Sequence, residues 1–267
     1  MRTQFKTLAI ACLATVTFAS CTKEVKEPTQ EEISDGTLAQ IKALGFGTKD
    51  VQKHEEGFLV EGDIVLTQDY LNSKSDYTLM RIANVEQYRT TNLVSGTRNI
   101  SLALDSKIAS KAGYKQALQE VANRYNALNL NLTFSVVTSG ANVTFSNANG
   151  SYLASAGFPS GGNPYNSVKV NTRAIGTGTS TTFINYLATI LAHELGHCIG
   201  FRHTDYMDRS YSCGGSTANE GASTVGAIHI PGTPTAADPN SWMLACIGTG
   251  QNRPFNANDR TALTYIY

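Results

Sequence analysis

The 267-residue chain has little charge and no excess of either sign. Lys and Arg together number 21, Asp and Glu together also number 21, and charged residues make up only 16% of the sequence. Because nucleic-acid-binding surfaces carry excess positive charge, we expect no nucleic-acid partner. After residue 20 the chain has no apolar run long enough to cross a bilayer, and no internal repeat is visible.

The first 20 residues have the features of a signal peptide. Arg2 and Lys6 precede an apolar stretch over residues 7–18, which is too short for a membrane-spanning helix. Residues 18–21, Phe-Ala-Ser-Cys, resemble the lipobox of bacterial lipoproteins and predict lipidation of Cys21. We therefore expect an exported lipoprotein of the bacterial outer membrane or cell surface, held by its N-terminal lipid alone. The polar residues 21–44 would form a flexible tether, and the alternative is ordinary secretion.

Cysteines are few, and most of the five have a predictable fate. Cys12 would leave with the signal peptide and Cys21 would carry the lipid, so Cys198, Cys213 and Cys246 remain. Export permits oxidation, and one disulfide plus one free thiol would account for these three, with three possible pairings. We favour Cys213–Cys246, which would join two segments of the C-terminal half.

The most informative stretch of the chain is residues 193–203, which read H-E-L-G-H-C-I-G-F-R-H. His193 and His197 are four residues apart, so they lie one turn apart on the same face of a helix. Gly200 lets the chain turn, and His203 can then return as a third imidazole. Three neutral imidazoles and one open position are the ligand set of a catalytic zinc site.

Glu194 stands next to the first ligand and has the properties of a general base. A carboxylate beside the open position can take a proton from the zinc-bound water and later pass it to the leaving amine. Each histidine alone would be an ordinary core or surface residue, but the shared spacing favours a metal site. Cys198 is not expected to be a ligand, because it points about 100° away from His197 on the helix.

The motif resembles the signature of the metzincin zinc endopeptidases, H-E-x-x-H-x-x-G-x-x-H followed by a methionine turn. Residues 241–244, Ser-Trp-Met-Leu, match that turn forty residues after His203. The stretch is most similar to the bacterial HEIGH metallopeptidases, or protease B of gliding bacteria, with Leu195 in place of isoleucine. The resemblance implies one Zn²⁺ ion, protein or peptide substrates, and Met243 as a hydrophobic floor under the imidazoles that does not bind the metal.

A second stretch, residues 60–64, resembles the F-x-G-D segment in the pro-region of astacin-type metzincins, with Val60 in place of phenylalanine. In that family the aspartate binds the zinc and displaces the water. The resemblance implies that Asp63 keeps the enzyme latent. The alternative is a plain turn, because Gly-Asp is a common turn pair.

The order of predicted elements is that of an α/β (α+β) metzincin-like domain, with a twisted mixed sheet, an active-site helix and an irregular C-terminal part. Strands are predicted at residues 57–66, 100–104, 132–136, 143–145, 152–156 and 167–170, and helices at about 114–128, 181–199 and 258–265. Residues 45–95 would be a pro-segment or N-terminal subdomain, and residues 96–267 the catalytic domain. An extended substrate would pair with an edge strand at residues 152–156.

Three further residues near the motif are candidates for supporting roles. Asp205 would orient a ligand, brace the loop or lie on the surface as a plain acid. Tyr206 or Tyr211 would either supply a phenol near the developing oxyanion or simply pack in the loop, and packing is favoured. The leading function is a monomeric zinc endopeptidase. The alternative is a surface lipoprotein whose zinc site serves binding or adhesion, and Glu194 argues against it because a structural site needs no base.

Overall fold

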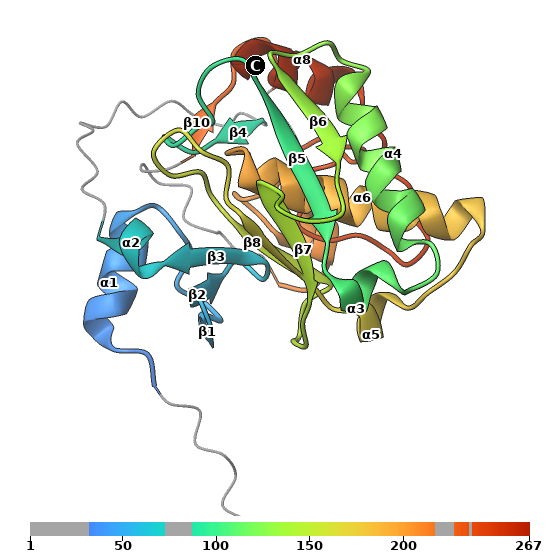
Figure 1. The fold of residues 1–267 in the computed structure, drawn as a ribbon. Coiled ribbons are helices and arrows are strands. Elements are labelled where there is room, and N and C mark those ends of the chain that lie inside the picture. The colour runs from blue at the N-terminus through green and yellow to red at the C-terminus, as the bar shows by residue number, and fades with distance from the viewer. Residues whose placement is uncertain (1–31, 73–86, 217–226, 235–236) are drawn as a thin grey trace, which may run out of the picture. The chain divides into compact units, whose positions relative to one another are not determined.

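A computed structural model of the chain describes residues 32–72, 87–216, 227–234 and 237–267 (Figure 1). The predicted signal peptide, residues 1–20, and the predicted lipidation site Cys21 lie outside these residues. Residues 33–267 form one compact unit. Its strands are β1 (Gln52–His54), β2 (Gly57–Val60), β3 (Ile64–Thr67), β4 (Tyr88–Arg89), β5 (Arg98–Leu104), β6 (Leu132–Val136), β7 (Val143–Asn147), β8 (Ala154–Gly157), β9 (Ser167–Val170) and β10 (Ile228–His229). Its helices are α1 (Asp35–Ala43), α2 (Gln68–Leu71), α3 (Ser106–Ala109), α4 (Tyr114–Asn126), α5 (Thr172–Ile175), α6 (Thr181–Cys198), α7 (Ser210–Cys213) and α8 (Ala257–Ile266).

Eight of these strands form one mixed sheet in the order β1-β2-β3-β8-β9-β7-β5-β6. The strands β6, β5, β7 and β9 are parallel to one another, whereas β8 runs antiparallel to β9. Alternation sets which side chains enter the core: in β5, Ile100 and Leu102 are fully buried, whereas Asn99 is exposed and Ser101 is half-buried. The mixed sheet and its helices confirm the predicted α/β class.

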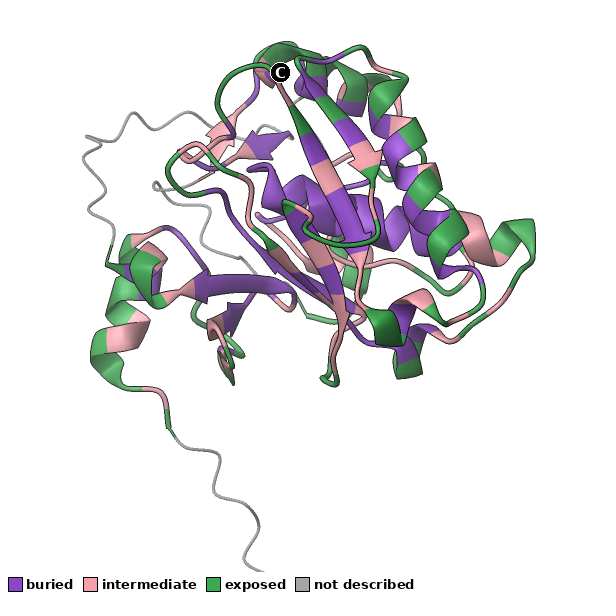
Figure 2. Ribbon diagram, viewed as in Figure 1, coloured by how far each residue is buried: buried purple, intermediate pink, exposed green. Residues whose placement is uncertain are grey.

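The two long helices α4 and α6 pack against each other and against the sheet (Figure 1). Leu118, Val121 and Tyr125 recur at helical spacing on the buried side of α4. Helix α6 is buried over its whole C-terminal part, from residue 186 to residue 198 (Figure 2). This helix therefore lies inside the core, where its side chains have fixed positions. None of the described helices is long and apolar enough to cross a membrane.

The structure corrects two expectations for the N-terminal part. The predicted strand over residues 57–66 is a hairpin, in which β2 and β3 pair antiparallel around a turn at residues 61–63. The predicted flexible tether over residues 21–44 ends earlier, because α1 lies within it. Ile41 on this helix is fully buried in a small second core with residues of β2, β3 and Phe158, so burial of apolar surface orders the segment.

The N-terminal part also changes the status of β8. The strand predicted to be a free edge for substrates pairs with β9 on one side and with β3 on the other. Residues Ile64 and Val65 of β3 run parallel to Ala156 and Gly157 of β8. Residues 52–67 therefore extend the sheet of the C-terminal part instead of forming a separate subdomain, and β8 is an interior strand.

Candidate metal centre

Helix α6 carries three of the predicted site residues. It is capped by Ser180, whose side chain accepts a hydrogen bond from the Phe183 amide at 3.2 Å, and it runs through an apolar sequence from Thr181 to Cys198. His193, Glu194 and His197 lie in its last two turns and are buried, with 8%, 3% and 0% of their surface exposed. The helix therefore presents two imidazoles and one carboxylate from a rigid support.

Gly200 allows the chain to turn directly after the helix. Its φ of +111° lies in the left-handed region that side chains disfavour. A Cβ atom there would also lie 2.8 Å from the Asn92 carbonyl oxygen and 2.7 Å from a methyl carbon of Leu93. Glycine is thus required both by backbone conformation and by space, and the turn returns His203 to the face of His193 and His197.

Two of the imidazoles are arranged as metal ligands. Nδ1 of His193 donates to the Trp242 carbonyl oxygen at 2.9 Å, and Nδ1 of His197 donates to the Phe201 carbonyl oxygen at 2.8 Å. These bonds place the proton on Nδ1 of each neutral ring and leave Nε2 as an acceptor. The two Nε2 atoms face each other at 3.1 Å, and two acceptors cannot satisfy one another without a cation between their lone pairs.

Asp63 comes from the turn between β2 and β3 and completes the cluster. One carboxylate oxygen lies 3.1 Å from His203 Nε2 and 4.0 Å from His197 Nε2, and the other lies 3.5 Å from His193 Nε2. Together the four side chains offer one ligand atom each, all within 4.8 Å of one another. Ligand atoms of a tetrahedral zinc site, with bonds of about 2.0–2.1 Å, are about 3.3 Å apart. The donor set and spacing therefore fit a metal ion.

The charges around the cluster shift its ionisation. Burial by itself would raise the pKa of Asp63, but the imidazoles, His203 first, hold it well below its usual range. Burial and the neighbouring Asp63 raise the pKa of Glu194 well above its ordinary value. Among the described residues, Oε2 of Glu194 has no hydrogen-bond partner.

A cavity of about 370 Å³ opens beside the cluster. His193, Glu194 and Asp63 contribute to its wall, α6 forms one side, and residues 151–154 and 244–247 form much of the rest. This volume lies in the range of small-ligand sites in proteins. Glu194 therefore lines the cavity, although only 3% of its surface is exposed.

Met243 is fully buried and packs under α6. A Cβ atom at Gly196 would lie 2.6 Å from the Met243 sulfur, so a side chain at position 196 would displace either the helix or the methionine. The Met243 carbonyl oxygen also accepts a hydrogen bond from the Thr204 amide. Sequence reasoning missed Gly196, although an isolated glycine inside a helix signals close packing.

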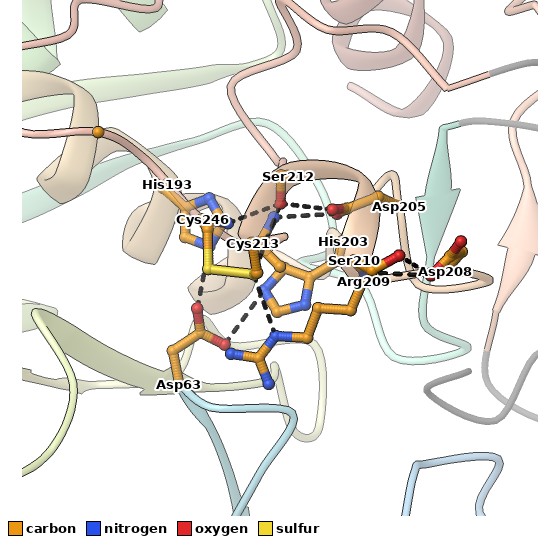
Figure 3. Close-up of a disulfide and its surroundings, with 12 residues drawn as sticks. Asp63, His193, His203, Asp205, Asp208, Arg209, Ser210, Ser212, Cys213 and Cys246 are labelled. Carbon is orange, nitrogen blue, oxygen red and sulfur yellow. Dashed lines mark hydrogen bonds and ion pairs between the residues drawn. A yellow bond between two sulfur atoms is a disulfide. The ribbon is translucent and has the colours of Figure 1, made fainter. Parts of the chain in front are cut away.

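Cys213 and Cys246 form a disulfide, the pairing that the sequence favoured among three (Figure 3). Asp205 lies beside it and is 2% exposed. Its carboxylate accepts hydrogen bonds from the Ala245 amide and the Ser212 hydroxyl, and the Ser212 oxygen in turn accepts from the Cys246 amide. Asp205 therefore braces the loop after His203 and is not a surface acid. Cys198 is a buried free thiol outside the metal cluster.

The two tyrosines considered for the oxyanion make other contacts. Tyr206 packs edge-on against Tyr88, with ring centroids 4.3 Å apart. Tyr211 is 47% exposed, and its hydroxyl donates to the Ala237 carbonyl oxygen. The Tyr206 contact agrees with the packing interpretation, whereas Tyr211 is largely exposed and is held by its hydroxyl group. Sequence reasoning also missed the buried pair of Arg202 and Glu61, because no local pattern relates residues 141 positions apart.

Comparisons with known proteins identify the family. Curated protein sequences give no match to this chain. Among solved structures the chain is similar to myroilysin, with 12% sequence identity, a TM-score of 0.36, and coverage of 66% of this chain and 96% of that chain. The model of the dual-action HEIGH metallo-peptidases matches residues 58–267, which include the hairpin with Asp63 as well as the histidine motif. Since the match spans well over half of the sequence, the chain belongs to this metallopeptidase family, as the metzincin-like motif predicted.

Proposed function

We propose that this protein is a zinc-dependent endopeptidase that is latent as the full chain. The observation that carries the proposal is the convergence of three imidazole nitrogens and the Asp63 carboxylate within 4.8 Å, next to Glu194. A zinc ion held by His193, His197 and His203 would polarise the scissile carbonyl and a water molecule. Zinc is the metal that most often takes three imidazoles and an exchangeable fourth ligand in peptidases.

The reaction would then depend on what the protein's own side chains do. Glu194 would accept a proton from the attacking water and deliver it to the departing amine. Burial raises the pKa of Glu194 and so favours the form that has taken up a proton. Trp242 and Phe201 hold the rings of His193 and His197 through their carbonyl oxygens, so the metal-binding nitrogens keep their direction during turnover.

Two features support latency. Asp63 lies where a fourth ligand would bind, and a carboxylate there would displace the water. Strand β3 occupies the side of β8 on which an extended substrate would form main-chain hydrogen bonds. The hairpin of β2 and β3 would thus block both the metal and the substrate strand, and activation would require its displacement.

The metal requirement can be tested on the full-length protein. We expect the purified chain to contain one zinc ion, measured by plasma mass spectrometry. Two samples are compared: protein with free zinc near 1,000 times its Kd, and protein stripped of zinc by a chelator. The free energy of unfolding should be about 4 kcal/mol lower in the stripped sample. In an Asp63→Ala chain the chelator should also abolish casein cleavage, and one equivalent of Zn²⁺, but not Mg²⁺, should restore it.

Two outcomes would contradict the proposal in different ways. Casein cleavage that persists after complete metal removal would exclude a metallopeptidase mechanism. An Asp63→Ala chain that keeps its zinc and cleaves neither casein nor peptides would favour the alternative, a surface lipoprotein with a binding-only metal site.

We further propose that the protein is exported and anchored through a lipid on Cys21. The signal-like residues 1–20 support this location, and the disulfide between Cys213 and Cys246 suits an oxidising compartment. Labelled palmitate fed to expressing cells should be incorporated into the wild-type chain and a Cys12→Ser control. The label should be absent from the Cys21→Ser variant, and this variant should no longer be found in the membrane fraction. A wild-type chain without label would contradict the anchor.

A further inference from the structure

Arg202 lies inside the metal-binding motif, directly before His203, and is fully buried. Arginine is rarely buried without a specific partner. Its closest contacts come from the N-terminal part: one terminal nitrogen donates to the Gly45 carbonyl oxygen at 2.9 Å, and the guanidinium lies 4.3 Å from the centre of the Phe46 ring. From the C-terminal part of the chain, the centre of the Tyr206 ring lies 5.7 Å from the guanidinium carbon of Arg202.

The charge partner of Arg202 is Glu61, at the tip of the same hairpin that carries Asp63. The second terminal nitrogen of Arg202 lies 2.6 Å and 2.8 Å from the two Glu61 carboxylate oxygens. Glu61 is 4% exposed and also accepts a hydrogen bond from the Gly47 amide at 3.1 Å. The backbone of Glu61 has a φ of +53°, which non-glycine residues rarely adopt. The turn therefore has an unfavourable backbone conformation at the residue whose carboxylate binds Arg202.

The position of this pair relates it to the substrate path. Glu61 precedes Asp63 by two residues, and the Asp63 carboxylate lies at the metal cluster. Residues 61–63 form the turn of the hairpin, and Arg202 directly precedes His203 of the cluster, so both members of the pair are within two residues of a residue of the metal cluster. A peptide whose bond lies at the metal would therefore bring the side chain of a residue near that bond to Arg202. When the hairpin leaves, Arg202 would lose its carboxylate partner Glu61 while its charge remains.

We propose that Arg202 is a carboxylate-binding subsite of the cleft, filled by Glu61 in the full chain and by an acidic side chain of the substrate in the active enzyme. This inference rests on the proposed peptidase function. A guanidinium group is always charged and its planar fork of donors fits a carboxylate, so an aspartate or glutamate side chain binds it better than the matching amide. The subsite would direct cleavage to bonds close to an acidic residue.

Carboxylate binding by Arg202 can be tested without measuring catalysis. The substitution Glu61→Ala removes the carboxylate from Arg202, and a small carboxylic acid is then offered in its place. In the full-length Glu61→Ala chain, millimolar propionate should raise the melting temperature by several degrees, measured against propionamide at matched ionic strength. Wild type should show no such difference, because Glu61 already fills the site. The double variant Glu61→Ala/Arg202→Met should lose the response. If Glu61→Ala does not fold in chloride buffer, the refolding yields in propionate and propionamide give the same comparison.

An equal response to propionate and propionamide would overturn the subsite, and so would a response that survives Arg202→Met. Either result would show that Arg202 does not select a carboxylate at this position.

The substrate is tested with pairs of peptides that differ only by Glu against Gln, at each position within three residues of the cleaved bond. In the full-length Glu61→Ala/Asp63→Ala chain we expect kcat/KM to be at least about tenfold higher for Glu at one position. Adding Arg202→Met should remove the preference, and adding Arg202→Lys should keep part of it. Cleavage of both peptides at equal rates would overturn the subsite and leave the proposed function standing. Cleavage of neither peptide nor casein would overturn the proposed function and the subsite with it.

Discussion

In a chain already freed of the Asp63 carboxylate, Glu194→Gln is expected to lower kcat for casein or peptide cleavage by about 10²–10⁴-fold. The amide has the shape of the carboxyl group but cannot accept the proton. Glu194 forms part of the cavity wall next to His193, and its Oε2 makes no hydrogen bond to the described residues. The substitution therefore leaves no protein donor unpaired at that oxygen, and we expect the fold to tolerate it.

The measurement needs controls that separate chemistry from metal loss. Zinc content and circular dichroism of the Glu194→Gln chain should match those of its parent, because the three histidines keep their positions. Glu120→Gln is a matched control, since Glu120 forms a partly exposed ion pair with Arg124 on α4. This control should leave kcat unchanged. A Glu194→Gln chain with full zinc and kcat within threefold of its parent would exclude Glu194 as the base.

The second large effect is expected in the opposite direction. Asp63→Ala should raise casein cleavage by the full-length chain by about 10–10²-fold. The substitution removes a ligand that the chain itself holds beside the metal, at an effective concentration in the millimolar range or above. Activation should stay incomplete, because β3 still pairs with β8 and Glu61 still binds Arg202.

Matched variants identify the cause of this activation. Asp69→Ala removes an exposed carboxylate from the same N-terminal part and should leave the chain latent. Asp63→Asn keeps the shape but is a weaker ligand, so it should give an intermediate rate. If Asp63→Ala retains zinc and is no more active than Asp69→Ala, the aspartate does not cause latency. A wild-type full-length chain that is already fully active would exclude latency altogether.

The local part of the metal site could be predicted because it depends on a short stretch of sequence. His193 and His197 share a helix face because residues four positions apart on an α-helix lie one above the other. Gly200 permits the turn that returns His203 to that face. The strands β5, β6 and β9 and the helix α8 were predicted for the same reason, since alternation and helical spacing are read within one element.

The parts that failed or were missed depend on long-range contacts. Residues 35–43 carry local helix-end signals, with Ser34 as N-cap and Lys42 in the last turn, but only the fold shows that Ile41 is buried in a cluster with Phe158 and the β2–β3 hairpin. Nothing near residues 154–157 shows that β3 covers their edge, because strand pairing depends on which segments meet in the fold. The isolated glycine at position 196 signals close packing, but only the fold shows that Met243 is the neighbour.

By itself the sequence determined the metal-binding motif: three histidines, one glutamate and a glycine turn within eleven residues specify a metal site whose spacing is set by helix geometry. Only the tertiary structure decided the state of that site. It brings Asp63 to the imidazoles across 130 residues, and it places Glu61 on Arg202 inside the motif itself. Local backbone geometry sets the arrangement of the histidines. The positions of Asp63 and Glu61 arise from burial of the β2–β3 hairpin, which depends on contacts with residues distant in the sequence.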